Sequence, residues 1–251
     1  MATGLRQTLL QLGWFDACLY WLGRLLIRAS GGRWSLHRYR YVAQYIGPQP
    51  LLGAHARGRG RDIAIHLHAA PYPVSVPWPR PPSAIASRHA QGAYSLVALR
   101  HGKLAGFLWL IDAAYQEDEV RARFCLAGAE ACWDFDVWVD PEERLGMVFA
   151  RLWEAARVLL RARGVRWSCS RISAFNPASL RAHAAIGVVP LGAALFLRCA
   201  GWQWTFANIA PYVHLSRSAS CCPEFRFDTR SLADLTLPEP PCPPKNSCAP
   251  S

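Results

Sequence analysis

One continuous stretch, residues 134–187, constrains the fold of this chain more than any other part. Its polar and apolar residues read in order as a strand, a glycine-containing turn, a helix, a second strand and a second helix. We predict a strand over 133–139, a turn over 140–146, a helix from about 147 to 163, a strand over 166–173 and a helix over 176–187. A turn of this kind at a helix N-terminus presents several free N–H groups, which suits a phosphate.

The rest of the chain adds strands that are rich in β-branched and aromatic residues. We predict them over 62–68, 93–100, 104–111, 188–198 and 202–206. Short turns containing Gly102 and Gly201 join the last four into two antiparallel hairpins. Six prolines between Pro71 and Pro82 predict a loop. From residue 93 the order is β-β-β-α-β-α-β-β, which indicates an α/β or α+β fold with a mixed sheet.

The pattern divides the chain into three parts. Residues 1–47 are an N-terminal helix followed by an aromatic and basic extension that we expect to be extended, and residues 48–215 are the main domain. Residues 216–251 lack sustained periodicity and end in a segment rich in proline and cysteine, so we predict a mostly disordered tail.

The N-terminal helix, predicted over residues 3–29, is amphipathic. Its apolar residues recur at helical spacing: Leu5, Leu9, Leu12, Phe15, Leu19, Leu22, Leu25 and Leu26. Asp16 lies near its centre, which argues against a membrane-spanning helix. Two interpretations stay open: a helix packed on the body of the protein, or an interfacial helix on a membrane surface, supported by its tryptophans and flanking arginines.

Composition excludes several classes of protein. The net charge is +11, and 26 of the 28 basic residues are arginine, but there is no compact basic run, so we expect no nucleic-acid partner. The nine cysteines show no zinc-binding spacing, so we expect no metal. The odd cysteine count and the absence of a signal-peptide pattern predict a reduced, cytoplasmic protein.

The turn after the first strand carries a recognisable motif. Val139-Asp140-Pro141 leads into Glu143-Arg144-Leu145-Gly146-Met147-Val148. This segment resembles the Gln/Arg-x-x-Gly-x-Gly/Ala loop of the GNAT superfamily of N-acyltransferases, with Gly146 at the first glycine and Glu143 and Val148 as substitutions. The resemblance implies a GNAT-like mixed, mostly antiparallel sheet with flanking helices. It also implies that acyl-CoA contacts the following residues: Val137, Val139, Arg144, Leu145, Gly146, Met147, Val148, Asn176 and Ser179.

The second helix extends the resemblance. Asn176 is followed by Ser179 at +3, His183 at +7 and Gly187 at +11, similar to the family's spacing, which has a tyrosine at +7. The resemblance implies that Asn176 contacts the pantetheine arm and that His183 protonates the leaving thiolate, because histidine also donates a proton near neutral pH. The alternatives from the residues alone are an Asn176 helix cap before Pro177 and a packing histidine.

The first strand supplies candidate bases. Alternation places Asp134, Asp136 and Trp138 on one face of the strand, and buried carboxylates need partners or a cleft. The resemblance implies a base on this strand, for which Asp136 is the first choice and Asp134 the second. The alternative is a structural carboxylate paired with Arg171 or Arg166.

The sequence therefore predicts an acyl-CoA-dependent N-acyltransferase, with acetyl-CoA by default, that transfers its acyl group by direct attack of an amine. The acidic cluster Glu117-Asp118-Glu119 either binds a cationic acceptor or is solvated surface. Two other functions stay open. One is a non-catalytic GNAT-derived module that contacts a membrane or a partner through its N-terminal helix, and the other is a transferase for long acyl chains carried by acyl carrier protein.

Overall fold

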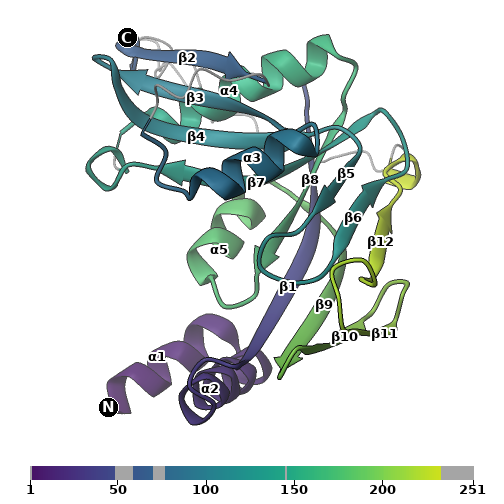
Figure 1. Cartoon of the computed structure of the whole chain (residues 1–251). Helices are drawn as coiled ribbons and strands as arrows, with labels where there is room; N and C mark the ends of the chain where they lie inside the picture. The colour runs from purple at the N-terminus through teal and green to yellow at the C-terminus, as the bar shows by residue number, and fades with distance from the viewer. Residues whose placement is uncertain (1, 49–58, 70–76, 145, 233–251) are drawn as a thin grey trace, which may run out of the picture.

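The computed structural model describes residues 2–48, 59–69, 77–144 and 146–232. In this part, the chain forms five α-helices, a nine-stranded sheet in the order β11-β10-β9-β1-β8-β7-β4-β3-β2 and a three-stranded sheet in the order β12-β6-β5 (Figure 1). The helices are α1 (Ala2–Leu12), α2 (Trp14–Ala29), α3 (Pro82–Ala90), α4 (Val148–Ala162) and α5 (Pro177–Ala185).

The large sheet is mixed and mostly antiparallel. Its strands are β1 (Trp34–Tyr45), β2 (Ile63–His68), β3 (Tyr94–Arg100), β4 (Lys103–Ile111), β7 (Ala131–Val139), β8 (Trp167–Ser173), β9 (Val189–Cys199), β10 (Trp202–Ala207) and β11 (Val213–Ser216). Only β7 and β8 are parallel among its described neighbours. This confirms the predicted fold class, and both hairpins, β3–β4 and β9–β10, lie where the sequence placed them.

Two cores lie on the two faces of this sheet. On one face, α4 buries Leu152, Ala156 and Leu160 against β3 and β4. On the other face lie α3 and the small sheet of β5 (Ala114–Gln116), β6 (Arg123–Leu126) and β12 (Glu224–Phe227). Aromatic rings fill this second core, and Phe124 stacks on Trp133 with ring centroids 4.6 Å apart. We call the two sides the α4 face and the α3 face.

The N-terminal extension is an interior part of the sheet. β1 lies between β8 and β9 and is antiparallel to both. Successive side chains of β1 point to opposite faces of the sheet, and Tyr39 and Tyr41 are buried on the α3 face. The boundary predicted near residue 47, between the N-terminal extension and the main domain, therefore separates strands that belong to one sheet.

The N-terminal helical segment is two helices and not the single helix predicted over residues 3–29. Gly13 separates α1 from α2 with a φ of 77°, a left-handed conformation that costs glycine little. α2 ends at Ala29, followed by Gly31 and Gly32 with positive φ, as the sequence predicted. In the described part of the chain, no helix has the length and apolar character needed to cross a membrane.

Two further departures from the sequence prediction are short elements. α3 begins at the last of the six prolines, a residue that suits the first turn of a helix because it has no N–H to satisfy. Within the predicted disordered tail, β12 pairs in parallel with β6 and buries Phe225 and Phe227. A four-residue strand is too short to produce a periodic signal, which is why the tail prediction is wrong there. Residues 233–251 lie outside the described part.

Candidate active site

The two parallel strands separate after a short paired segment. Residues 131–133 of β7 pair with residues 167–169 of β8. Beyond them, β7 stays paired with β4 as far as Val139, and β8 stays paired with β1 as far as Ser173. We call the opening between residues 134–139 and 170–173 the notch. Backbone N–H and C=O groups on the two facing edges have no strand partner among the described residues, so they are available to an extended ligand.

A β-bulge in β7 divides the two aspartates between the two faces. The register with β4 shifts between Phe107 and Trp109, and Asp136 has a φ of 46°. A bulge adds one residue and shifts the alternation of side chains. Asp134 therefore lies on the α4 face and Asp136 on the α3 face, and the predicted placement of both on one face is wrong.

Asp136 is held by two arginines from the segment around α3. Arg80 Nε donates to Asp136 Oδ2 at 2.8 Å, and Arg88 Nη1 donates to the same oxygen. Burial acts to raise the pKa of Asp136, but the hydrogen bonds from Arg80 and Arg88 outweigh it and hold the pKa below its ordinary value. The partners predicted from sequence, Arg166 and Arg171, are wrong, because α3 was not foreseen.

These groups belong to a charged cavity of about 470 Å³ on the α3 face. Arg171 Nη2 lies 2.8 Å from Glu117 Oε1 and 3.0 Å from Glu119 Oε2. The predicted acidic cluster thus lines a cavity. The lining residues are Arg80, Arg88, Tyr115, Glu117, Asp118, Glu119, Phe135, Asp136 and Arg171.

Two carboxylates of this cavity reach solvent. The side chain of Glu119 is 53% exposed and that of Asp118 is 33% exposed, whereas that of Glu117 is 1% exposed. Burial would raise the pKa of Glu119, but Arg171 and a hydrogen bond from Tyr39 lower it. Asp118 and Glu119 pair with Arg88 and Arg171, and the cavity lining as a whole holds four carboxylates and three arginines.

Asp134 has a different environment at the vertex of the notch. It is buried, and it accepts a hydrogen bond from Ser168 Oγ at 2.7 Å. None of the ion pairs in the described residues involves it. Burial raises the pKa of Asp134 to about 6, although the hydrogen bond from Ser168 and the positive charge at His183 act to lower it.

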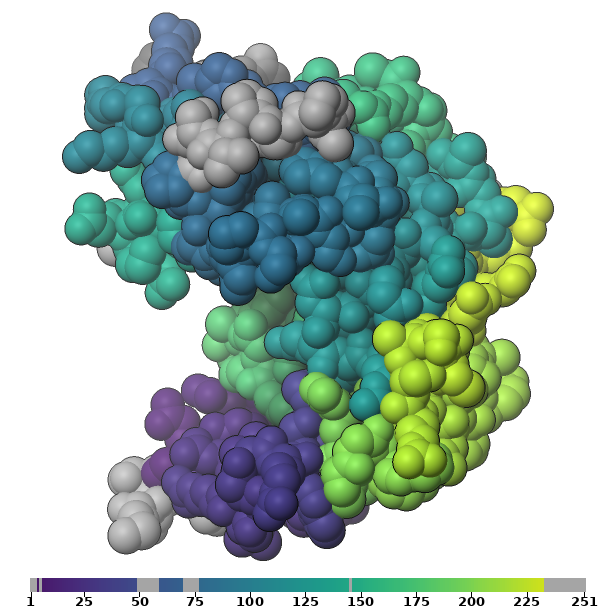
Figure 2. Space-filling model, viewed as in Figure 1, coloured from purple at the N-terminus to yellow at the C-terminus, as the bar shows by residue number. Residues whose placement is uncertain are grey.

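The helix after β8 brings His183 to the same face. The Asn176 side chain caps α5 by accepting from the Ser179 N–H at 3.1 Å. His183 Nδ1 lies 2.8 Å from the carbonyl oxygen of Ser179, which assigns the proton to Nδ1. His183 also lines a groove of about 900 Å³ with Leu12 and Ile172, which we call the α5 groove. Figure 2 shows the molecule hollowed between the purple N-terminal helices and the teal part of the chain.

The turn after β7 leads into α4. Gly146 N–H donates to the carbonyl oxygen of Glu143 at 2.9 Å, and the Glu143 carboxylate pairs with Arg100 on β3. Among the described residues no side chain caps the start of α4. Val148 is fully buried in the core, whereas Arg144 is exposed. Leu145 lies outside the described residues.

The other predicted ligand contacts follow from these placements. The side chains of Val137 and Val139 are partly buried against the core under α4, and their backbone groups lie on the edge of the notch. Met147 is the residue at the start of α4. Sequence reasoning missed Arg80 and Arg88, which no local motif marks, and missed Ser168 as the partner of Asp134.

Comparisons with known proteins find only distant similarities to solved structures. No family model matches the sequence. A search of curated proteins also finds no match. Similar solved structures include a conserved protein of unknown function from Staphylococcus epidermidis, at 12% identity and a TM-score of 0.44, covering 69% of this chain and 66% of that one. A putative GNAT acetyltransferase from Novosphingobium aromaticivorans has 15% identity and a TM-score of 0.42, covering 64% and 62%.

A tandem GNAT protein from the clavulanic acid biosynthesis pathway has 16% identity and a TM-score of 0.40, covering 65% of this chain and 54% of that one. This chain thus spans less than two thirds of the length of each of these three proteins. The descriptions of the second and third name GNAT, the family that the sequence resembles. Identities and TM-scores this low carry no argument about activity.

Proposed function

We propose that this protein is an acyl-CoA-dependent N-acyltransferase that works in the notch between β7 and β8. The observation that carries the proposal is the separation of two parallel interior strands while each keeps its outer partner. Leaving backbone groups unpaired inside a sheet costs free energy, so a ligand with amide groups is a natural occupant. The pantetheine arm of coenzyme A carries two amides.

The donor enters along the α4 face. The pyrophosphate lies at the turn before α4, where the Met147 backbone N–H lies at a helix N-terminus, Gly146 leaves room for the phosphates and Arg144 supplies an exposed positive charge. The backbone of Val137 and Val139 meets the pantetheine amides. Asn176 and Ser179 border the arm at the start of α5.

The acceptor is an amine that enters from the α3 face. The exposed carboxylates of Asp118 and Glu119 attract a cation to the charged cavity. The acceptor nitrogen loses a proton and attacks the thioester carbonyl, the C–S bond breaks, and the thiolate receives a proton. No covalent intermediate with the enzyme is needed.

Asp134 fits the general base better than Asp136 does. A base works best when its pKa is close to the operating pH, and the pKa of Asp134 is raised to about 6 whereas that of Asp136 is lowered. Asp134 takes the proton through a bridging water, and His183 on the same face donates to the thiolate. Asp136 holds Arg80 and Arg88 in place.

Titration calorimetry with coenzyme A, acetyl-CoA and longer acyl-CoAs tests the proposal. The wild-type chain should bind, and its melting temperature should rise with ligand concentration. Gly146→Asp should abolish binding, because it places a carboxylate at the phosphate turn. Gly4→Asp is the matched control: it adds the same charge where a Cβ meets open space. Absence of binding at about millimolar ligand, a concentration that detects even affinities near −4 kcal/mol, would overturn the donor assignment.

The same titration separates the alternatives. A preference for long acyl chains would favour the carrier-protein donor over acetyl-CoA. Binding without turnover on a panel of amines would favour the non-catalytic module. None of the described cysteines is in a disulfide, and both the reduced state and the cytoplasmic location stay predictions. A membrane contact of residues 3–29 is independent of this chemistry.

A further inference from the structure

The outward face of the N-terminal helix pair is apolar. On α2, Trp14, Cys18, Trp21 and Leu25 recur at spacings of four, three and four residues, so they share one face of the helix. Trp14 is 74% exposed and Leu25 is 63% exposed. Together with Leu10 of α1, which is 79% exposed, and Leu22 of α2 they form what we call the apolar face. An exposed patch with two tryptophans marks an interaction site.

The inward side of α2 is fixed by polar contacts. Asp16 is buried, 2.7 Å from Arg40 Nη2 and 3.1 Å from Arg38 Nε on β1. Gly23 lies so close to the sheet that a Cβ at this position would contact the Leu36 side chain at 3.4 Å. Rotating α2 to hide its tryptophans would bring Asp16 out of these ion pairs and put a larger residue at Gly23. The apolar face is therefore held outward by the fold.

The border of the apolar face is positively charged. Arg6, Arg24, Arg28 and Arg33 are exposed, and no acidic residue is exposed within residues 2–34 of the described chain. In sequence, the first 61 residues contain nine arginines and one acid, Asp16. Arg24 lies over the rings of Tyr20 and Trp21 at 5.7 and 5.9 Å. Tryptophan and arginine side by side suit the headgroup layer of a bilayer, because each has an apolar body and a polar tip.

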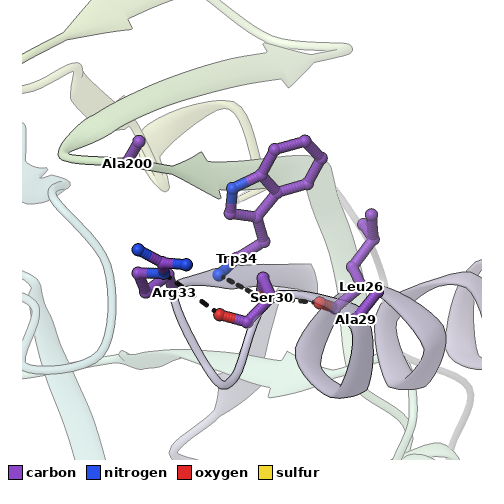
Figure 3. Close-up of a pocket in the computed structure, with 6 residues that line it drawn as sticks. All are labelled: Leu26, Ala29, Ser30, Arg33, Trp34 and Ala200. Atoms are coloured by element: carbon purple, nitrogen blue, oxygen red, sulfur yellow. Dashed lines mark hydrogen bonds between the residues drawn. The ribbon is translucent and has the colours of Figure 1, made fainter.

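A hollow of about 350 Å³ lies at the C-terminal end of α2. Figure 3 shows Leu26, Ala29 and Trp34 around it, with the Arg33 side chain at its rim. Arg33 Nε donates to the Ser30 carbonyl oxygen at 3.2 Å, and the Trp34 N–H donates to Ser30 Oγ at 2.8 Å. The hollow therefore combines an apolar lining with a fixed cation at the edge of the apolar face.

The charge pattern decides which occupant fits. A second copy of the chain docked through the same face would bring the two sets of arginines together, and like charges across an interface disfavour association. An anionic lipid surface suits both the arginines and the apolar face. Its headgroups pair with the arginines, and the tryptophans and leucines enter the layer between the headgroups and the acyl chains.

We propose that α1 and α2 dock this protein on an anionic membrane surface, with the apolar face in the lipid and Arg6, Arg24, Arg28 and Arg33 at the headgroups. The protein lies on the bilayer and does not span it. In this orientation the α5 groove, which Gln11 and Leu12 of α1 help to line, opens beside the lipid surface. The proposal does not depend on acyl transfer.

Cosedimentation of the full chain with vesicles tests it. Binding to phosphatidylcholine vesicles should be weak, and adding phosphatidylglycerol should strengthen it by at least about tenfold, an effect that added salt reverses. The double variant Trp14→Ser, Leu25→Ser should bind anionic vesicles at least about tenfold less tightly, because two large apolar groups leave the lipid. Arg24→Gln with Arg28→Gln should cost about tenfold.

Matched controls use exposed residues elsewhere. Phe206→Ser with Leu215→Ser removes two large apolar side chains, each a little less than half exposed, from β10 and β11, and Arg123→Gln with Arg226→Gln removes two exposed cations from the small sheet. Both should bind like the wild type. Circular dichroism and thermal unfolding check that each variant is folded, and Leu10→Ser on α1 is a second probe of the apolar face.

Three results would overturn the proposal. The first is equal binding to neutral and anionic vesicles. The second is equal loss in the control and apolar-face variants. The third is a dimer, detected by sedimentation equilibrium without lipid, that Trp14→Ser, Leu25→Ser dissociates, because the face would then bind a second copy.

Discussion

The two faces of the sheet differ most where they meet the notch. On the α3 face, Asp136 is one of four carboxylates packed with three arginines in a single cavity. On the α4 face, Asp134 is buried against Ser168 and has no ion pair among the described residues. Two aspartates that are two residues apart on one strand therefore have pKa values displaced in opposite directions.

The comparison teaches that a single bulge places two aspartates of one strand in different electrostatic environments. A carboxylate clamped by two arginines stays ionised and fixes positions, whereas a buried carboxyl without a cation can gain and lose a proton near neutral pH. If Asp134 and Asp136 shared a face, Arg80 and Arg88 would reach both. Each prediction below changes one face and leaves the other intact.

The largest effect should come from Asp134→Asn. The amide keeps the shape of the side chain and removes the base, so we expect kcat to fall on the order of a hundredfold or more. In the wild type, kcat should rise with pH through about 6, where Asp134 loses its proton, and the variant should lose this rise. Asp136→Asn in the same assay is the control, with a smaller expected change. Equal losses in the two variants would remove the distinction between the faces.

His183→Ala should reduce kcat about a hundredfold, at the lower end of the range for a lost general acid. Binding of acyl-CoA should change little, since its phosphate contacts lie at the turn before α4. His101→Ala, at an exposed histidine, is the control. Near-normal turnover in His183→Ala would leave this histidine as a packing residue.

Asp136→Ala should act on stability. It leaves Arg80 and the buried Arg88 without one of their partners, and we expect unfolding to become about 3 kcal/mol easier. Chemical denaturation measures this loss. Asp228→Ala, which breaks an exposed pair with Arg230, should have no measurable effect. Equal stability of Asp136→Ala and wild type would show that the arginines do not depend on this carboxylate.

The same two aspartates should give pH dependences of stability with opposite sign. In the folded protein, Asp134 binds its proton more tightly than in the unfolded chain. The stability that Asp134 contributes should therefore decrease as pH rises from about 4 to about 6. The pKa of Asp136 is lowered in the folded protein. The stability that Asp136 contributes should therefore be fully present above the ordinary pKa of an aspartate and be lost as pH falls below that value. Chemical denaturation of the wild type, Asp134→Asn and Asp136→Asn across pH 3 to 7 measures how the free energy of unfolding changes with pH. Each variant should lose the pH dependence that its aspartate causes.

The smallest effect should come from Glu119→Gln at the entrance of the charged cavity. Its carboxylate is half exposed, so water and salt screen its attraction for a cationic amine. We expect KM for the amine to rise a few-fold with kcat unchanged. Glu224→Gln, an exposed acid on β12, should change neither. A large loss of kcat in Glu119→Gln would place this residue in the chemistry.

Much of the notch was predictable because its elements are local. Periodicity and turn residues gave β7, α4, β8 and α5 close to their observed bounds, and the cap at Asn176 follows from its place before Pro177. The hairpins β3–β4 and β9–β10 followed from short glycine turns between β-rich runs. His183 faces the α5 groove because it lies on the helix that Asn176 starts.

The sequence by itself determined which segments become strands and helices, because these depend on neighbours a few residues away. Only the tertiary structure decided which strands meet: β1 enters the sheet between β8 and β9, and β12 pairs with β6, about 100 residues earlier. The bulge at Asp136 is also decided there, because the register with β4 sets it and Arg80, before α3, and Arg88, on α3, hold the Asp136 side chain. Pairing and register join distant residues, so a local pattern does not reveal them, and here they give Asp134 and Asp136 different environments.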